Sequence, residues 1–271
     1  MLESGSVVYI PDLGFPTKEE ERAFFEPGFL RLNSKNVSWD PMTNAVRGLK
    51  SSHSASDAEL AVLGAMMARF ARFGEELFTS LLGEYAERLT TARTSFRPVE
   101  IEGRKSRTVG SNDALLHVDS FSSRPMGNQR ILRIFTNVNL GDRPRVWRVG
   151  EPFDKVAKRF APHLKRPCPG QRAVMHLLKL TKSYRTLYDH YMLRLQMKMK
   201  ADEEYQRSVE QTRIEFPPGS TWICFTDQVS HAALSGQHLL EQTYYLPVER
   251  MSREERSPLR VLESLLGRPL V

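Results

Sequence analysis

The sequence predicts a mainly β protein with flanking helices, α+β overall, built on an antiparallel β core in one domain, 1–271. Apolar and polar residues alternate with a period of two in residues 94–150 and 213–249. Apolar residues recur at helical spacing in 56–89 and 184–199. Strand clusters early and late in a chain, with helices before and between them, are typical of helices around one antiparallel core. A length of 271 residues with 40% apolar content suffices for such a domain.

Residues 1–93 are expected to form an irregular lead-in followed by a supporting helix. The turn signals PDLGFP and DPMTNAVRG interrupt residues 1–50 and favour irregular structure. A long helix is predicted to begin after Ser56, because Ser56 and Glu59 match a capping box. The helical stripe that follows consists of Leu60, Leu63, Met67, Phe70, Leu77, Leu81 and Leu89.

Residues 94–150 are expected to supply the first strands of the β core, from the segments TSFRPVEIEGR, ALLHVDSF and RILRIFTNVNL. Along the last segment, alternate residues share a face. One face is apolar, with Leu132, Ile134, Thr136 and Val138. The other face carries Arg133, Asn137 and Asn139 beside Ile131 and Phe135, which is unusual for a plain core face.

A helical insertion is predicted at 151–206, and further strands at 213–249, including EFPPGSTWICFTD and LEQTYYLPV. Within the insertion, one apolar stripe consists of Tyr184, Leu187, Tyr188, Tyr191, Met192, Leu195 and Met199. A C-terminal amphipathic helix is predicted at 257–267. Ser257 is suited to the cap, Pro258 to the first helical position and Gly267 to the terminator.

The segment LLHVDSF contains the residues that point to chemistry. Because residues i and i+2 of a strand face the same side, His117 and Asp119 can present a nitrogen and an oxygen to one point. His231, in FTDQVSHAALSG, is the candidate third ligand. Two histidines and one carboxylate form the facial triad of non-haem Fe(II) oxygenases. A zinc site with these ligands, or a buried His–Asp pair with His231 unrelated, remains an alternative.

The composition of the chain indicates which kinds of partner and which cellular compartment are expected. The net charge of +7 favours anionic partners such as nucleic acid, anionic lipid or a phosphorylated or carboxylated substrate. Cys168 and Cys224 are too few for a disulfide framework and fit a reducing compartment. The N-terminus lacks a signal-peptide pattern, and no apolar run reaches the roughly 18 residues of a membrane span. A cytoplasmic protein, soluble or peripheral to a membrane, is expected.

Several segments resemble the Kdo 3-hydroxylases, bacterial enzymes of lipopolysaccharide assembly that depend on Fe(II) and 2-oxoglutarate. They are, in order, TSFRPVEIEGR, LHVDSFSSRP, RILRIFTNVN, RVWRVGEPF, YDHYMLRL, MKADEEYQ, FPPGSTWICFTDQVSHAAL and LEQTYYLPV. The resemblance implies a double-stranded β-helix (jelly-roll) core, with His117, Asp119 and His231 as iron ligands and with 2-oxoglutarate and O₂ as co-substrates. The implied reaction is hydroxylation of carbon 3 of a 3-deoxy-D-manno-oct-2-ulosonic acid (Kdo) residue on a lipid A precursor.

The resemblance also implies a 2-oxoglutarate pocket formed by Arg97, Arg133, Arg145 and Trp147. A planar guanidinium binds a carboxylate through two parallel hydrogen bonds, which suits a dicarboxylate co-substrate. Arg133 is the strongest candidate, because an arginine that interrupts an apolar strand needs a buried anion. In the segment matching MLRLQMKMK the family carries a histidine thought to assist catalysis, whereas this sequence has Gln196, which can form hydrogen bonds but cannot titrate near neutral pH.

The expected partner is a Kdo-containing lipid A precursor, reached by peripheral contact with the inner membrane. Basic runs such as 143–148 and 155–172 can complement the carboxylate of the sugar and the phosphates of the lipid. Nucleic acid is not expected, because no base-stacking aromatic cluster interleaves with these runs. Two alternatives stay open: a 2-oxoglutarate oxygenase acting on nucleic acid or peptide, and a non-catalytic jelly-roll binding module.

Overall fold

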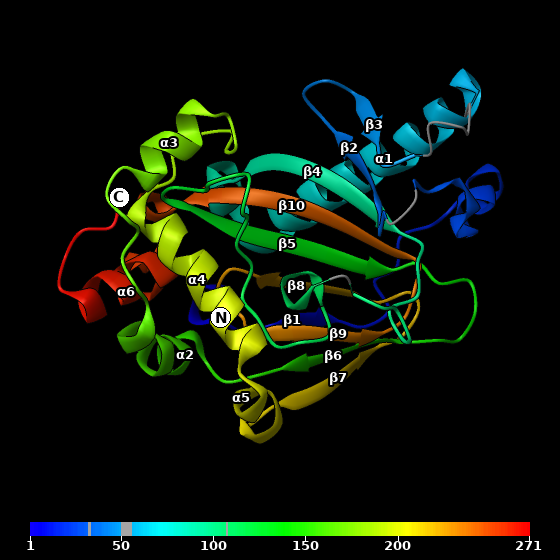
Figure 1. The fold of residues 1–271 in the computed structure, drawn as a ribbon. Helices are drawn as coiled ribbons and strands as arrows, with labels where there is room; N and C mark the ends of the chain where they lie inside the picture. The colour runs from blue at the N-terminus through cyan, green and yellow to red at the C-terminus, as the bar shows by residue number, and fades with distance from the viewer. Residues whose placement is uncertain (32–33, 50–55, 107) are drawn as a thin grey trace.

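Two antiparallel sheets face each other in the computed structural model, which describes residues 1–31, 34–49, 56–106 and 108–271 (Figure 1). The larger sheet has the strand order β1-β8-β5-β10-β4-β2-β3, and the smaller has the order β7-β6-β9. The strands are β1 (Val8–Ile10), β2 (Val37–Asp40), β3 (Ala45–Arg47), β4 (Thr90–Arg97), β5 (Gln129–Asn137), β6 (Arg145–Val149), β7 (Thr212–Phe216), β8 (Thr221–Phe225), β9 (His231–Ser235) and β10 (Leu239–Pro247). This confirms the predicted jelly-roll core with flanking helices.

The alternation predicted along β5 is confirmed by the packing. Leu132 and Ile134 belong to the larger apolar core. Phe135 lies on the opposite face and packs in a second cluster between the sheets with Trp147 and Trp222. Because side chains alternate along a strand, Arg133 shares this inner face and points between the two sheets.

The helix α1 (Asp57–Leu82) packs on the larger sheet, against β4 and β10. The predicted capping box begins it: the Ser56 amide donates to a Glu59 carboxylate oxygen at 2.8 Å, and the Glu59 amide donates to the Ser56 hydroxyl at 3.2 Å. Midway along α1, Gly74 lies so close to the Tyr244 hydroxyl that a Cβ has no room there. Helix and sheet therefore approach closely at this point.

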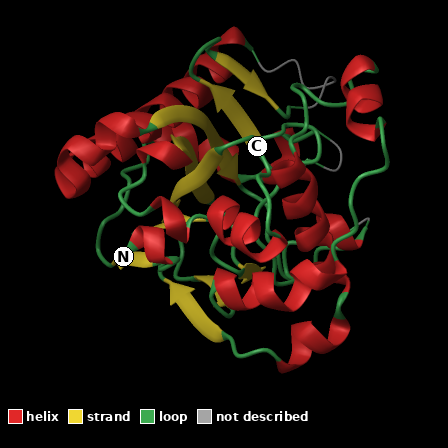
Figure 2. Ribbon diagram, turned by 90° about the vertical axis from the view of Figure 1, so that its left-hand side faces the viewer, coloured by secondary structure: helices red, strands yellow, loops and turns green. Residues whose placement is uncertain are grey.

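The other helices gather at one end of the two sheets (Figures 1 and 2). They are α2 (Phe153–Phe160), α3 (Gln171–Leu177), α4 (Leu187–Ala201), α5 (Glu203–Ser208) and α6 (Pro258–Leu266). In α6, Leu259 and Leu262 are buried and the helix contacts α2, so the apolar face of the tail packs on the domain. The Arg260 amide donates to the Ser257 hydroxyl, and Gly267 ends the helix in the left-handed region, as predicted. Among the described helices, none is long and apolar enough to cross a membrane.

Some expected boundaries are wrong. The lead-in is not wholly irregular, because β1, β2 and β3 extend the two edges of the larger sheet. The segment ALLHVDSF is not a strand: only His117 pairs, in an isolated bridge with His231. The strand predicted from 94 runs instead from Thr90 to Arg97, where Pro98 follows without an amide to donate. Tyr184 precedes α4 and is exposed rather than part of its buried stripe.

Candidate active site

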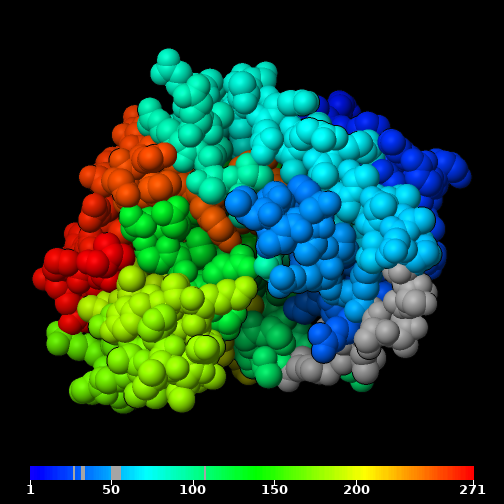
Figure 3. Space-filling model, turned by 90° about the horizontal axis from the view of Figure 1, so that it is seen from above, coloured from blue at the N-terminus to red at the C-terminus, as the bar shows by residue number. Residues whose placement is uncertain are grey.

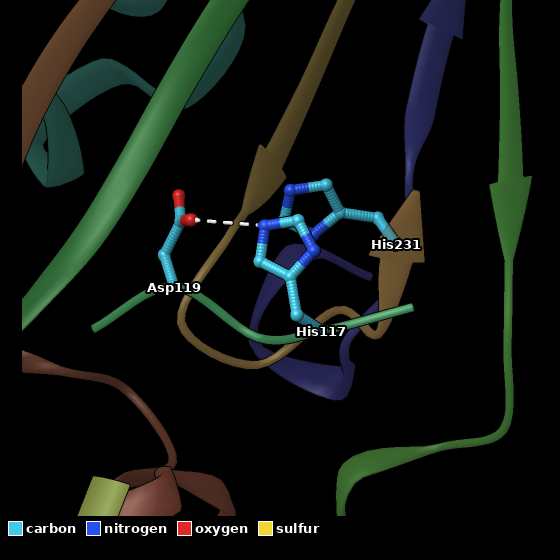
Figure 4. A group of neighbouring side chains, drawn as sticks. All are labelled: His117, Asp119 and His231. Carbon is cyan, nitrogen blue, oxygen red and sulfur yellow. Dashed lines mark ion pairs between the residues drawn. The ribbon is translucent and has the colours of Figure 1, made fainter. Parts of the chain in front are cut away.

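The backbone brings the three predicted ligands together (Figure 4). The amide of His117 donates to the carbonyl of His231 at 3.0 Å, and the amide of His231 donates back to His117 at 2.9 Å. The amide of Asp119 donates to the carbonyl of Thr226, in the turn that precedes His231. As a result, one ligand atom from each of His117, Asp119 and His231 lies within 4.8 Å of the other two. His231 lies more than a hundred positions after His117 and Asp119 in the sequence, yet the three residues form one cluster.

Both imidazoles are held in the tautomer that a metal requires. Nδ1 of His117 lies 2.8 Å from the Leu115 carbonyl, and Nδ1 of His231 lies 2.8 Å from the Val229 carbonyl. Because a carbonyl only accepts, each Nδ1 carries the proton and each Nε2 keeps a free lone pair. Burial, repulsion from His231 when it is protonated and repulsion from Lys200 lower the pKa of His117 to about 3. Burial also lowers the pKa of His231. Both rings are therefore neutral at physiological pH.

Asp119 completes the cluster as an ionised carboxylate. One oxygen, Oδ1, lies 3.7 Å from Nε2 of His117, and the other, Oδ2, lies 2.9 Å from a guanidinium nitrogen of Arg133. Burial raises the pKa of Asp119, but the positive charge of Arg133 outweighs it and the net shift is downward. Two neutral imidazole nitrogens and one carboxylate oxygen match the donor set of a facial triad. The residues present therefore fit an Fe(II) ion.

A pocket between the two sheets adjoins this cluster, and all four predicted co-substrate residues line it. Arg97 comes from β4, Arg133 from β5, and both Arg145 and Trp147 from β6. The ring of Trp147 stacks on that of His231, with centroids 5.0 Å apart. The structure thus brings the metal cluster and the predicted 2-oxoglutarate residues to one place.

The three arginines of the pocket differ in their charge partners. Arg133 pairs with Asp119 and lies 3.5 Å from Glu241, and Arg97 pairs with Glu241 at 2.8 Å. The buried anion expected for Arg133 is thus present, and the protein itself supplies it. Arg145 has no carboxylate partner within the described residues; one of its nitrogens donates to the Gly236 carbonyl.

Three buried donors of the pocket have no acceptor within the described residues: Nε of Arg133, and Nε of Arg145 and Nε1 of Trp147, which are two residues apart on β6. Burial lowers the pKa of Arg145 to about 9, and repulsion from Arg97 and Arg104 adds to the effect. Buried polar groups normally find partners. A guanidinium without a counter-ion beside an unpartnered indole N–H therefore fits the far carboxylate of 2-oxoglutarate.

Two acids that line the pocket, Glu241 and Asp113, are absent from the site residues predicted from the sequence. Glu241 lies in β10 and neutralises Arg97 and Arg133; a single acid inside the apolar segment LLEQTYYLP is the signal that could have indicated it. Asp113 lines the pocket and pairs with Lys35 and Arg104 at 2.8 and 2.9 Å. These acids set how much positive charge remains for a ligand.

Gln196 lies on α4 and is half-buried, one turn before Lys200. It is absent from the described lining of the pocket. Lys200 is buried, and its ammonium donates to the Gly110 carbonyl at 2.9 Å. Burial lowers its pKa, against the attraction of Asp113 and Asp119. The same flank of α4 therefore lies near the site, and a catalytic contribution from Gln196 stays a prediction.

Comparison with known proteins agrees with this geometry. A sequence model of 3-deoxy-D-manno-oct-2-ulosonic acid (Kdo) hydroxylase matches residues 1–269. A crystal structure of the Kdo hydroxylase KdoO, a non-haem Fe(II) α-ketoglutarate-dependent dioxygenase, in complex with α-ketoglutarate and Fe(III), is 44% identical with a TM-score of 0.94. The match covers 100% of this chain and 89% of that chain.

The cobalt(II) complex of KdoO is similar at 45% identity and a TM-score of 0.95, with the same coverage of both chains. The complex of KdoO with succinate and Fe(III) is similar at 44% identity and a TM-score of 0.94, again over 100% of this chain and 89% of that chain. No curated protein matches the sequence. The family expected from the sequence is thus confirmed, and this chain belongs to the Kdo hydroxylase family.

Proposed function

We propose that this protein is an Fe(II)- and 2-oxoglutarate-dependent dioxygenase that hydroxylates carbon 3 of the Kdo sugar of a lipid A precursor in lipopolysaccharide biosynthesis. The observation that carries the proposal is the convergence of His117, Asp119 and His231 within 4.8 Å, next to a pocket with an uncompensated arginine. Family membership supports the substrate class. A non-catalytic binding module would not need three metal ligands next to a pocket for an anion.

His117 and His231 would each hold Fe(II) through a nitrogen and Asp119 through an oxygen, and this donor set of three would leave the ion open to co-substrates. The chemistry that iron, 2-oxoglutarate and O₂ supply together is oxidation of an unactivated C–H bond. Arg133 fixes Asp119 through the 2.9 Å ion pair, so the carboxylate keeps one oxygen toward the histidines. The protein itself contributes geometry and charge rather than proton transfer to the sugar.

Arg145 and Trp147 are proposed to hold the far carboxylate of 2-oxoglutarate, since their buried N–H groups lack acceptors. Arg97 and Arg133 flank this position, and Glu241 neutralises part of their charge. Three guanidinium groups and three carboxylates line the pocket, but Asp113 is paired with Lys35 and Arg104 from outside the lining. Asp119 and Glu241 are then the acids left to offset the three arginines, with an excess of one positive charge. This small excess of positive charge favours an anionic co-substrate, whereas a larger excess would bind anions without selectivity.

The substrate also suggests where the protein works. A Kdo-containing lipid A precursor is embedded in a membrane, so we place the protein at the cytoplasmic face of the inner membrane as a peripheral enzyme. The cysteines of the chain are free thiols, which accords with a reducing compartment. The basic excess of the chain complements the carboxylate of the sugar and the phosphates of the lipid.

The test is to purify the protein without oxygen and to measure Fe(II) stoichiometry and succinate release. We expect one Fe(II) per chain, and succinate formation that a Kdo-containing lipid A precursor stimulates together with a hydroxylated sugar product. Succinate release that DNA or a peptide stimulates, but the lipid does not, would assign a different substrate. A protein that binds no iron and forms no succinate would be a binding module.

A further inference from the structure

The surface around α3 leaves apolar side chains uncovered. The α3 patch is defined as Val174, Leu177, Leu178, Leu180 and Tyr184, which are between 48% and 79% exposed. The helix α3 itself has no buried residue. In the described part of the chain, fourteen large hydrophobic side chains are exposed, and these five fall within eleven consecutive positions. Single exposed leucines are ordinary on soluble proteins, whereas a contiguous cluster marks a surface that binds something.

The patch is one continuous surface because the chain folds back on α3. The Leu180 amide donates to the Met175 carbonyl at 3.0 Å. The ring of Tyr184 contacts that of His176, and the guanidinium of Arg172 lies 5.3 Å from the centre of the Tyr184 ring. From above, the yellow-green residues that include α3 and α4 form one lobe of the molecular surface (Figure 3). Helix and returning loop thus present their apolar side chains together.

Positive charge surrounds these apolar side chains. Residues 161–188 contain six basic residues and no Asp or Glu. Lys165, Arg166, Lys179 and Lys182 are exposed, Arg172 is partly buried and Arg185 is buried. The nearby cation Arg124 is the main cause that lowers the pKa of the exposed Lys182. Aliphatic side chains ringed by lysine and arginine match an anionic lipid surface, because the former enter the interface and the latter pair with phosphates.

The patch is also connected to the metal cluster. The amide of Lys182 donates to the Ser123 carbonyl at 2.9 Å, and the guanidinium of Arg185 donates to the Ser122 carbonyl. Ser122 follows the ligand Asp119 by only three residues. A surface that docks at the α3 patch therefore lies next to the segment that leads into the proposed active site.

We propose that the α3 patch docks this protein on an anionic lipid surface, with its leucines inserted at the interface and the surrounding cations paired with lipid phosphates. The proposal rests on the proposed function, since a lipid-borne sugar must be reached at a membrane. A second copy of this chain is the other candidate occupant. The five cations of residues 161–188 that are not buried would meet the same five across such a two-fold contact, so like-charge repulsion favours lipid.

The test is co-sedimentation of the full chain with vesicles of phosphatidylcholine alone and of phosphatidylcholine with phosphatidylglycerol. The variant L177E/L178E introduces two charges into the patch. The matched control L140E/L265E introduces the same two charges at exposed leucines outside it. We expect wild type and L140E/L265E to bind the phosphatidylglycerol vesicles, and L177E/L178E to bind at least about tenfold more weakly. K179Q/K182Q should weaken this binding about tenfold or more, in a salt-dependent way.

Equal binding of L177E/L178E and the control would overturn the proposal, and so would equal binding of wild type to both kinds of vesicle. A concentration-dependent dimer that L177E/L178E abolishes, without vesicle binding, would assign the patch to a second copy and overturn it as well. Iron content and turnover of a water-soluble deacylated Kdo saccharide should stay unchanged in L177E/L178E, with at least a fivefold loss on vesicle-borne lipid. Vesicle binding through the patch by a protein that turns over no Kdo substrate would refute the hydroxylase proposal alone.

Discussion

Arg145 and Arg133 lie in the same pocket but differ in their partners, and this predicts opposite effects for the same substitution. Arg145 is buried without a carboxylate partner, so R145M removes an uncompensated charge and one hydrogen bond to Gly236. We expect the metal-free protein to change in stability by no more than about 1 kcal/mol. Arg133 is the cation that pairs with the buried Asp119, so R133M leaves that carboxylate without its partner, whereas Glu241 keeps Arg97. That costs about 3–5 kcal/mol, a fall in melting temperature on the order of 10 °C.

For the affinity for 2-oxoglutarate we expect the opposite order, with the larger effect from R145M. Removing one partner of a buried, hydrogen-bonded charge pair costs about 3–4 kcal/mol, which at about 1.4 kcal/mol per tenfold is a loss of about 10² to 10³ in affinity. We therefore expect R145M to raise the Kd for 2-oxoglutarate by this factor while its Fe(II) stoichiometry stays near one. R133M should weaken Fe(II) binding, because Asp119 loses the cation that orients it.

The assays are anaerobic calorimetric titration with 2-oxoglutarate and thermal unfolding of both variants after treatment with a chelator. R145K serves as a control that keeps the charge and loses the planar fork, and its affinity should lie between those of wild type and R145M. The reasoning would be refuted if R145M bound 2-oxoglutarate as wild type does. It would also be refuted if R145M were destabilised as much as R133M.

Three further outcomes follow from the site. H231A should bind less than a tenth of the wild-type iron while the melting temperature after chelation stays within a few degrees, because the bridge to His117 is made by backbone atoms; retained iron would contradict the ligand assignment. Burial raises the pKa of Asp113, but Lys35 outweighs it and lowers the pKa to about 2, below the unfolded value near 3.9. Its stabilisation of about 2 kcal/mol is thus complete above pH 4 and is lost as pH falls toward 2, so urea unfolding should show wild type and D113N converging below pH 4. Q196H should raise kcat severalfold with an unchanged Kd for 2-oxoglutarate, and an unaltered kcat would place residue 196 outside the catalytic machinery.

Much of the fold could be predicted because its signals are local. The capping box of Ser56 and Glu59, the alternation along β5 and the cap of Ser257 each depend on a few neighbouring residues, and the structure confirms all three. The strands β1 to β3 could not be predicted, since each has only three or four residues. β1 pairs with β8 and β2 pairs with β4, which are distant in sequence, and β3 joins the sheet only through β2.

In the candidate site, too, the features with local sequence signals could be predicted and those that depend on distant pairing could not. His117 and Asp119 are two residues apart, and their spacing indicated a shared direction although the segment is not a strand. The hydrogen bond from the Asp119 amide to the Thr226 carbonyl, rather than a regular ladder, holds the second ligand in place. Glu241 was missed because its role depends on the register that sets β10 between β4 and β5. The sequence could indicate an arginine that needs an anion, but not which anion the fold would supply.

The isolated bridge between His117 and His231 also bears on which ions the protein can exchange. Amide-to-carbonyl bonds set the spacing of the two rings, so the spacing does not depend on an ion. An arriving cation then has no chain segment to order, unlike in small zinc domains that fold only around their metal. We therefore expect that one divalent ion can replace another without unfolding; a crystal structure of KdoO, which is similar to this chain, is of its cobalt(II) complex.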